Sequence, residues 1–131
     1  MRSIAFLALT LILTPVVAGH TVREVMDAIN QVEASGHKSN VPLGDRGRAR
    51  GPLQIHVEYH SDSRVAGTWA MCEDYEYSVR VATAYMRRYE PAALDAVNAR
   101  QLAMLHHYGP GWRGKNSDPD GYWAKVKANL D

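Results

Sequence analysis

The sequence predicts a single, mostly helical domain with a loop-rich insertion after its first helix. Apolar residues recur at helical spacing in several separate segments. Gly, Pro, Asn and Arg are instead concentrated between positions 36 and 51, which indicates loops with room for a short hairpin. The 131-residue chain is 46% apolar and 22% charged, as in ordinary globular proteins. No repeat or linker divides it, so one compact unit is expected.

The first predicted helix runs from Val22 to about Ser35. Thr21 and Glu24 have the spacing of a capping box, in which each side chain bonds the other's backbone N–H. Gly36 stands where such a helix would end, which places Glu33 in the last turn.

Further helices are predicted in the second half of the chain. One covers Asp74 to Tyr89, and a second opens at an Asn98 cap and stops before Gly109. The last opens at Asp118 and Pro119, since Pro is tolerated in a first helical turn. Residues 52–55 are either a brief strand or an extended approach to a helix, and residues 56–67 have no clear pattern.

Residues 1–18 have the layout of a secretory signal peptide. Arg2 gives a positive start, the run from Ile4 to Leu13 has no charge, and Ala18 is a small residue suited to cleavage. The run is shorter than the about 20 apolar residues that span a bilayer. We therefore expect a secreted protein, extracellular or periplasmic, with its domain at residues 19–131 and no membrane contact after processing. The alternative is a buried N-terminal helix.

Charge and cysteine content exclude several classes of protein. The chain has 15 basic and 14 acidic side chains, without the basic excess of a nucleic-acid binder. Its one cysteine, Cys72, excludes an internal disulfide and a multi-cysteine zinc site. We expect this thiol to be buried and the protein to be a monomer. His56 and His60 lie four positions apart, but no third ligand is evident, so no metal site is expected.

Two carboxylates lie in contrasting settings. The C-terminal end of a helix carries partial negative charge, which favours a protonated Glu33, as a general acid requires. Asp45 lies in the polar turn Gly44–Gly47, where a carboxylate stays ionised or simply forms the turn. Such a pair is what glycosidic cleavage needs, because one group donates a proton while the other stabilises or captures the cationic sugar.

Around these residues the sequence resembles the invertebrate-type (destabilase) lysozymes and their bacterial lysozyme-like relatives. The matching block consists of the Glu-containing helix end, the acidic loop and a Gly-Pro-x-Gln-Ile segment. Tyr59 with Asp62 is similar to a Tyr-Trp-x-Asp segment of that family. The matches run in the family's order over most of residues 19–131: VEASG at 32–36, GDRG at 44–47, GPLQI at 51–55, YMRRY at 85–89, AMLHHYGP at 103–110 and YWAKV at 122–126.

The resemblance implies an α+β, mostly α, lysozyme-like domain with a small β element beside a glycan cleft. It implies hydrolysis of the β-1,4 bond between N-acetylmuramic acid and N-acetylglucosamine, without a cofactor. Glu33 matches the general acid and Asp45 the second carboxylate. The expected partner is peptidoglycan or a chitooligosaccharide, and the expected glycan contacts are Gln54, Tyr59, His106 and Tyr108. Gln54 could equally bond loop backbone.

Departures from the family's pattern leave two other functions open. Ala34 replaces Ser beside the acid, Met104 replaces Arg, and His107-Tyr108 replace Asn-Gly. These changes allow a glycan-binding protein that has lost turnover. A lytic transglycosylase, which uses one acid/base group and forms an anhydro product, is the other alternative.

Overall fold

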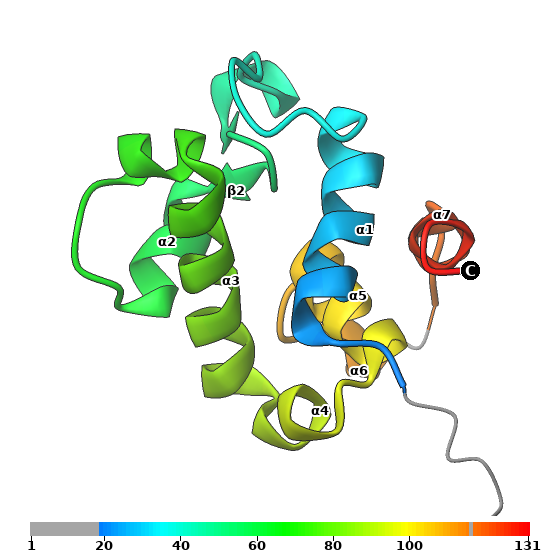
Figure 1. The fold of residues 1–131 in the computed structure, drawn as a ribbon. Helices are drawn as coiled ribbons and strands as arrows, with labels where there is room; N and C mark the ends of the chain where they lie inside the picture. Colours follow the sequence, from blue (N-terminus) through cyan, green and yellow to red (C-terminus); the bar gives the residue numbers. More distant parts are fainter. Residues whose placement is uncertain (1–18, 116) are drawn as a thin grey trace, which may run out of the picture.

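The computed structural model describes residues 19–115 and 117–131, and it confirms the predicted α+β, mostly α, class. The predicted signal peptide at 1–18 lies outside the described residues. Figure 1 shows the small two-stranded sheet at one end of the molecule, with most of the helices on one side of it. The helices and strands are α1 (Val22–Ala34), β1 (Ala49–Arg50), β2 (Ile55–His56), α2 (Val57–Ser63), α3 (Tyr75–Tyr89), α4 (Pro91–Ala96), α5 (Ala99–Tyr108), α6 (Trp112–Lys115) and α7 (Tyr122–Ala128), with short 3-10 helices η1 (Asp45–Gly47) and η2 (Trp69–Glu73).

Helix α1 begins and ends as predicted. The Thr21 hydroxyl accepts from the backbone N–H of Glu24 at 3.1 Å, and the Glu24 carboxylate accepts from that of Thr21. Ser35 then adopts a left-handed conformation (φ 52°) and ends the helix. One face of α1 is fully buried against α5 and α7, so the last turn, which contains Glu33, lies next to both.

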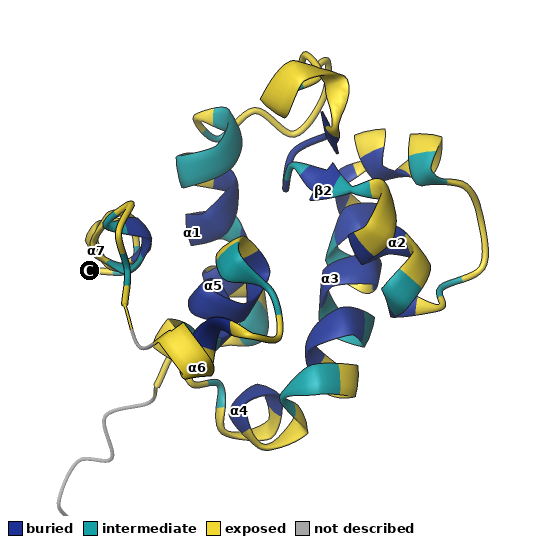
Figure 2. Cartoon of the chain, turned by 180° about the vertical axis from the view of Figure 1, so that it is seen from behind, coloured by how far each residue is buried: buried dark blue, intermediate teal, exposed yellow. Residues whose placement is uncertain are grey.

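The core lies between α1, α3 and α5, whose buried faces turn inward in Figure 2. Apart from Asn30, its largest fully buried side chains are aliphatic or Met, and they fill the core by close packing. Cys72 is buried as expected, and burial raises the pKa of its thiol to about 11. No helix in the described part of the chain is long and apolar enough to cross a membrane.

The β element consists of only two strands of two residues each, within and just after the predicted loop insertion. Ala49 pairs with His56 and Arg50 with Ile55 in antiparallel register. Residues 52–55 were expected to be a brief strand or an extended approach to a helix. Residues 51–54 instead form the connecting turn, and only Ile55 is extended, in the strand that leads directly into α2. Gly51 has φ +78°, and a Cβ there would lie 1.9 Å from the carbonyl oxygen of Cys72. This close approach seats the turn against η2.

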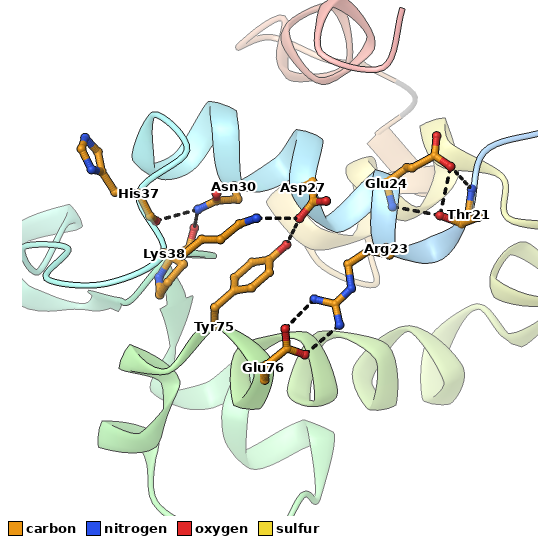
Figure 3. Close-up of polar contacts among 10 residues, drawn as sticks. Thr21, Arg23, Glu24, Asp27, Asn30, His37, Lys38, Tyr75 and Glu76 are labelled. Carbon is orange, nitrogen blue, oxygen red and sulfur yellow. Dashed lines mark hydrogen bonds and ion pairs between the residues drawn. The ribbon is translucent and has the colours of Figure 1, made fainter.

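A buried amide connects the end of α1 to this β element. The Nδ2 of Asn30 donates to the carbonyl oxygens of His37 at 2.9 Å and Pro52 at 3.0 Å (Figure 3). Two turns earlier on the same side of α1, Arg23 forms a bidentate ion pair with Glu76 of α3 (Figure 3). The first pair of bonds fixes how the turn before β2 lies relative to the last turns of α1.

Several sequence predictions were wrong in detail. The last helix begins at Tyr122, because the Asp118 carboxylate accepts from the backbone N–H of Tyr122 and of Trp123 across a loop. The short helices α2, α4 and α6 were not predicted, since two turns or fewer give no readable period.

Candidate functional site

The C-terminal end of α1, the β element and the end of α5 surround an open cleft of about 500 Å³. Of the predicted site residues, all but Tyr59 line it. The lining side chains are Glu33, Asp45, Ala49, Gln54, His56, His106, His107, Tyr108 and Asp120.

Glu33 is a half-buried carboxyl group in the last turn of α1. Its Oε1 accepts a hydrogen bond of 2.8 Å from the Tyr122 hydroxyl. Burial raises the pKa of Glu33, while the bond from Tyr122 and the positive charges of His107, His56 and Lys125 oppose the rise. No basic residue lies in the last turn of α1 to stabilise a charge there. In this position the carboxyl group keeps its proton to a higher pH than an ordinary glutamate does.

Asp45 also lines the cleft and lies in a strained turn. Its backbone is left-handed (φ 46°), as is that of Arg46 (φ 57°). The half-exposed carboxylate lies 3.4 Å from Nε2 of His56 and 3.7 Å from Nη2 of Arg48. The carboxylate thus faces solvent, an imidazole and a guanidinium, whereas Glu33 is half-buried and bonded by a tyrosine hydroxyl.

His106 forms a neutral part of the cleft wall. Burial lowers the pKa of this histidine to about 4. Because the carbonyl of Leu53 can only accept, Nε2 carries the proton and donates to it at 3.0 Å. Nδ1 then accepts from the Tyr59 hydroxyl at 3.0 Å. Both ring nitrogens are occupied, so His106 offers the cleft only carbon edges and its face.

Tyr59 does not lie where the sequence placed it. Its ring is buried and stacks on Tyr85 with centroids 3.7 Å apart. It contacts His106 from the side of the core and is absent from the cleft lining. Tyr59 therefore does not contact the cleft as predicted, and its hydroxyl instead holds the imidazole of His106 in place.

Gln54 lines the cleft and bonds loop backbone at the same time. Its Nε2 donates to the carbonyl oxygen of Gly51 at 3.0 Å. Its Oε1 occupies the space where a Cβ on Gly44 would lie, 1.9 Å away. The amide therefore joins the turn before β2 to the turn that holds Asp45.

Sequence reasoning missed three side chains of the site, namely His107, Asp120 and Tyr122, and it predicted Tyr108 without its contacts. His107 stacks on Tyr122 with centroids 4.1 Å apart and an interplanar angle of 4°, and its Nε2 donates to Asp120 at 2.8 Å. Tyr108 donates to Asp118 and accepts from the backbone N–H of Asp120. Tyr122 appears in the sequence only as part of the YWAKV match, and nothing local reveals its bond to Glu33, 89 positions away.

The histidines considered as metal ligands are separated. His56 faces Asp45, whereas His60 is buried with its Nε2 2.8 Å from the hydroxyl of Tyr77. Within residues 19–115 and 117–131, no three His, Cys, Asp or Glu side chains come together as a metal site requires.

Comparison with known proteins places this chain beside lysozymes of two oysters. It is 33% identical to "Lysozyme" of Ostrea edulis over 87 residues, which cover 65% of this chain and 63% of that protein. It is 35% identical to "Lysozyme 1" of Crassostrea virginica over 81 residues, which cover 60% of this chain and 43% of that protein. The chain thus spans less than two thirds of either relative. No family profile and no solved structure matches it.

Proposed function

We propose that this chain is a muramidase with Glu33 as its general acid. The comparisons identify it as a relative of the invertebrate-type lysozymes. Its substrate would be the β-1,4 bond between N-acetylmuramic acid and N-acetylglucosamine. The observation that carries the proposal is the setting of Glu33, a cleft carboxyl group with a pKa raised by burial and one oxygen bound by Tyr122. A general acid needs this combination of access and retained proton.

We assign the two oxygens of Glu33 different tasks. Since the Tyr122 hydroxyl donates to Oε1, the transferable proton belongs on Oε2. This proton passes to the glycosidic oxygen as the bond from that oxygen to the sugar C1 breaks. The electron pair of that bond leaves with the oxygen, and the sugar ring becomes an oxocarbenium-like cation. Asp45 supplies the negative charge that stabilises or captures this cation. Water then forms a bond to C1 and gives a proton to the Glu33 carboxylate, which restores the acid.

The remaining lining suits a glycan. Tyr108 offers an aromatic face at the cleft rim, on which a sugar ring can stack. Gln54 and Asp120 offer polar atoms to hydroxyl and acetamido groups. His106 has no free nitrogen, so we assign it an apolar contact with the sugar rather than a hydrogen bond.

Replacement of Glu33 by Gln tests the proposal. Gln keeps an oxygen that accepts from Tyr122 but has no acidic proton. Release of reducing sugars from purified peptidoglycan should fall by roughly 10²- to 10⁴-fold. Glu76→Gln, which changes an exposed carboxylate on α3, is the matched control and should retain full activity. Equal release by wild type and Glu33→Gln, with circular dichroism unchanged, would contradict the proposal.

A lytic transglycosylase is the second candidate. It is favoured by the position of Asp45, which is half exposed and paired with His56 and Arg48. A transglycosylase needs only the acid/base group. Full activity of Asp45→Asn, together with anhydro-muropeptides in mass spectra, would select this reaction. Chitooligosaccharide binding without any product would instead select the non-catalytic glycan-binding protein.

We further propose that the protein acts outside the cytoplasm. The support is the charged start and uncharged run within residues 1–18. Expression of the full sequence in a secreting host, followed by N-terminal sequencing of the medium, tests this. A product beginning near Gly19 is expected, and retention of the uncleaved chain in the cells would contradict it.

A further inference from the structure

We propose that His107 is a positioning residue for Glu33, which it serves by holding the Tyr122 ring while Asp120 holds His107. This inference rests on the proposed function, since it concerns the general acid of that reaction. His107 is also one of the positions at which the chain departs from the motif it resembles, where Asn is usual. The replacement of Asn by His107 therefore changes how Tyr122, and through it Glu33, is held.

Three helices meet at this point. Glu33 comes from α1, His107 from α5 and Tyr122 from α7. Helix α7 has only seven residues, too few to be stable without tertiary contacts, and it packs against both α1 and α5. What holds Tyr122 in place therefore decides whether its hydroxyl reaches the carboxyl group.

Tyr122 is held at three points. Its backbone N–H donates to the carboxylate of Asp118 at 2.8 Å. One face of its ring is covered by His107, nearly parallel and with centroids 4.1 Å apart. Its hydroxyl donates to Glu33 at 2.8 Å. The stacking contact fixes the ring between the backbone anchor and the hydroxyl, so its loss frees the hydroxyl to leave Glu33.

His107 is itself anchored. Its Nε2 donates to the Asp120 carboxylate at 2.8 Å, and its ring meets that of Tyr108 edge to face. Tyr108 in turn donates to Asp118, the residue that holds the backbone of Tyr122. The contacts form a closed set, in which α5 and the start of α7 fix one another.

Charge acts in the same direction as the stacking contact. The charged groups that face Glu33 are His107 on α5, His56 on β2 and Lys125 on α7, and each lowers its pKa. Those that face His107 are Asp120, Glu33 and Asp118, together with the neutral His106. Loss of His107 removes an imidazole that lowers the pKa of Glu33, and it weakens the bond from Tyr122. Both changes remove contributions that lower the pKa of Glu33, while burial continues to raise it. The pKa should therefore rise further.

The test is an NMR titration of the Glu33 side-chain carboxyl carbon in the intact protein. We expect His107→Asn to move the midpoint to higher pH. His107→Phe should move it less, because a phenyl ring keeps the stacking contact. His20→Asn is the matched control, since His20 is an exposed histidine paired with a carboxylate at the other end of α1. It should leave the midpoint in place.

Kinetics separate positioning from simple contact with substrate. We expect His107→Asn to lower kcat about fivefold, the factor for one neutral hydrogen bond of typical strength, with KM little changed. The alkaline limb of the pH–kcat profile should shift upward with the titration. Asp120→Ala should act in the same direction.

An unchanged Glu33 midpoint in folded His107→Asn would overturn the proposal, and a rise in KM alone would instead assign His107 to substrate contact. The titration needs no turnover. A shifted midpoint in a protein without hydrolytic activity would therefore support the positioning role while the proposed function fails.

Discussion

The hydroxyl of Tyr59 donates to Nδ1 of His106 at 3.0 Å, and Nε2 of the same ring donates to the carbonyl oxygen of Leu53 at 3.0 Å. The imidazole thereby joins α2, α5 and the turn before β2 through one neutral ring. Protonation at Nδ1 would turn the acceptor of the Tyr59 bond into a second donor. The cleft wall and the core beneath it therefore depend on a single protonation state.

Acid should destabilise the protein through His106. The folded state holds its pKa at about 4, against 6.5 ordinarily, so the unfolded state binds the proton more readily. The stabilisation is present above about pH 6.5 and is lost as pH falls toward 4, by about 3 kcal/mol in total. Urea unfolding at pH 7.5, 5.5 and 4 measures this. His106→Gln should be less stable at pH 7.5 but less sensitive to acid, and equal sensitivity in both proteins would refute the assignment.

Tyr59→Phe should destabilise the fold by about 1–3 kcal/mol, because it leaves Nδ1 of His106 buried without a donor. The ring stack on Tyr85 remains. Tyr85→Phe is the control, since the Tyr85 hydroxyl makes no hydrogen bond within the described residues and its ring keeps the same stack. Denaturant midpoints compare the two. Similar losses in both variants would show that the bond to His106 contributes little.

Glu33→Gln should make the protein more stable near pH 7.5 than the wild type. Burial raises the pKa of Glu33, so its stabilising contribution is present at low pH and is lost as pH rises through the folded value. Gln carries no charge at any pH. The difference in Tm between variant and wild type should therefore be large at pH 7.5 and small at pH 4. A difference that does not change with pH would argue against a buried charge.

Gly51→Ala should destabilise the β element far more than Gly47→Ala. Both glycines have positive φ, +78° and +84°. At Gly47 a Cβ meets open space, so only backbone strain of about 1 kcal/mol is expected. At Gly51 the Cβ would lie 1.9 Å from a backbone carbonyl oxygen, and roughly 3 kcal/mol or more is expected. Equal Tm values for the two variants would show that the turn can move away from η2.

Local signals account for the elements that sequence alone predicted. The capping box at Thr21 and the caps at Asp74 and Asn98 each involve residues three positions apart, and all three form as hydrogen bonds. Longer helices also repeat their apolar face often enough to be read. Short helices such as α4 do not, and they form because packing supports them.

The candidate site divides in a similar way. Glu33 was identifiable because a carboxyl group at a helix C-terminus is electrostatically unusual and stands in a family-like motif. Tyr59 was misplaced, since a motif match does not say which side of the cleft wall a ring occupies. His107 and Tyr122 were missed as supports of the acid, because their contacts join residues distant in the chain.

The sequence by itself determined where the long helices begin and end, which carboxyl group stands at the end of the first, and which lysozyme family the chain resembles. These depend on neighbours within a few positions, or on motifs kept in order. Only the tertiary structure decided which groups surround that carboxyl group, that Tyr122 bonds it, and that His106 is neutral. Burial and bonds between distant residues set a proton affinity, and they exist only once the helices have packed together.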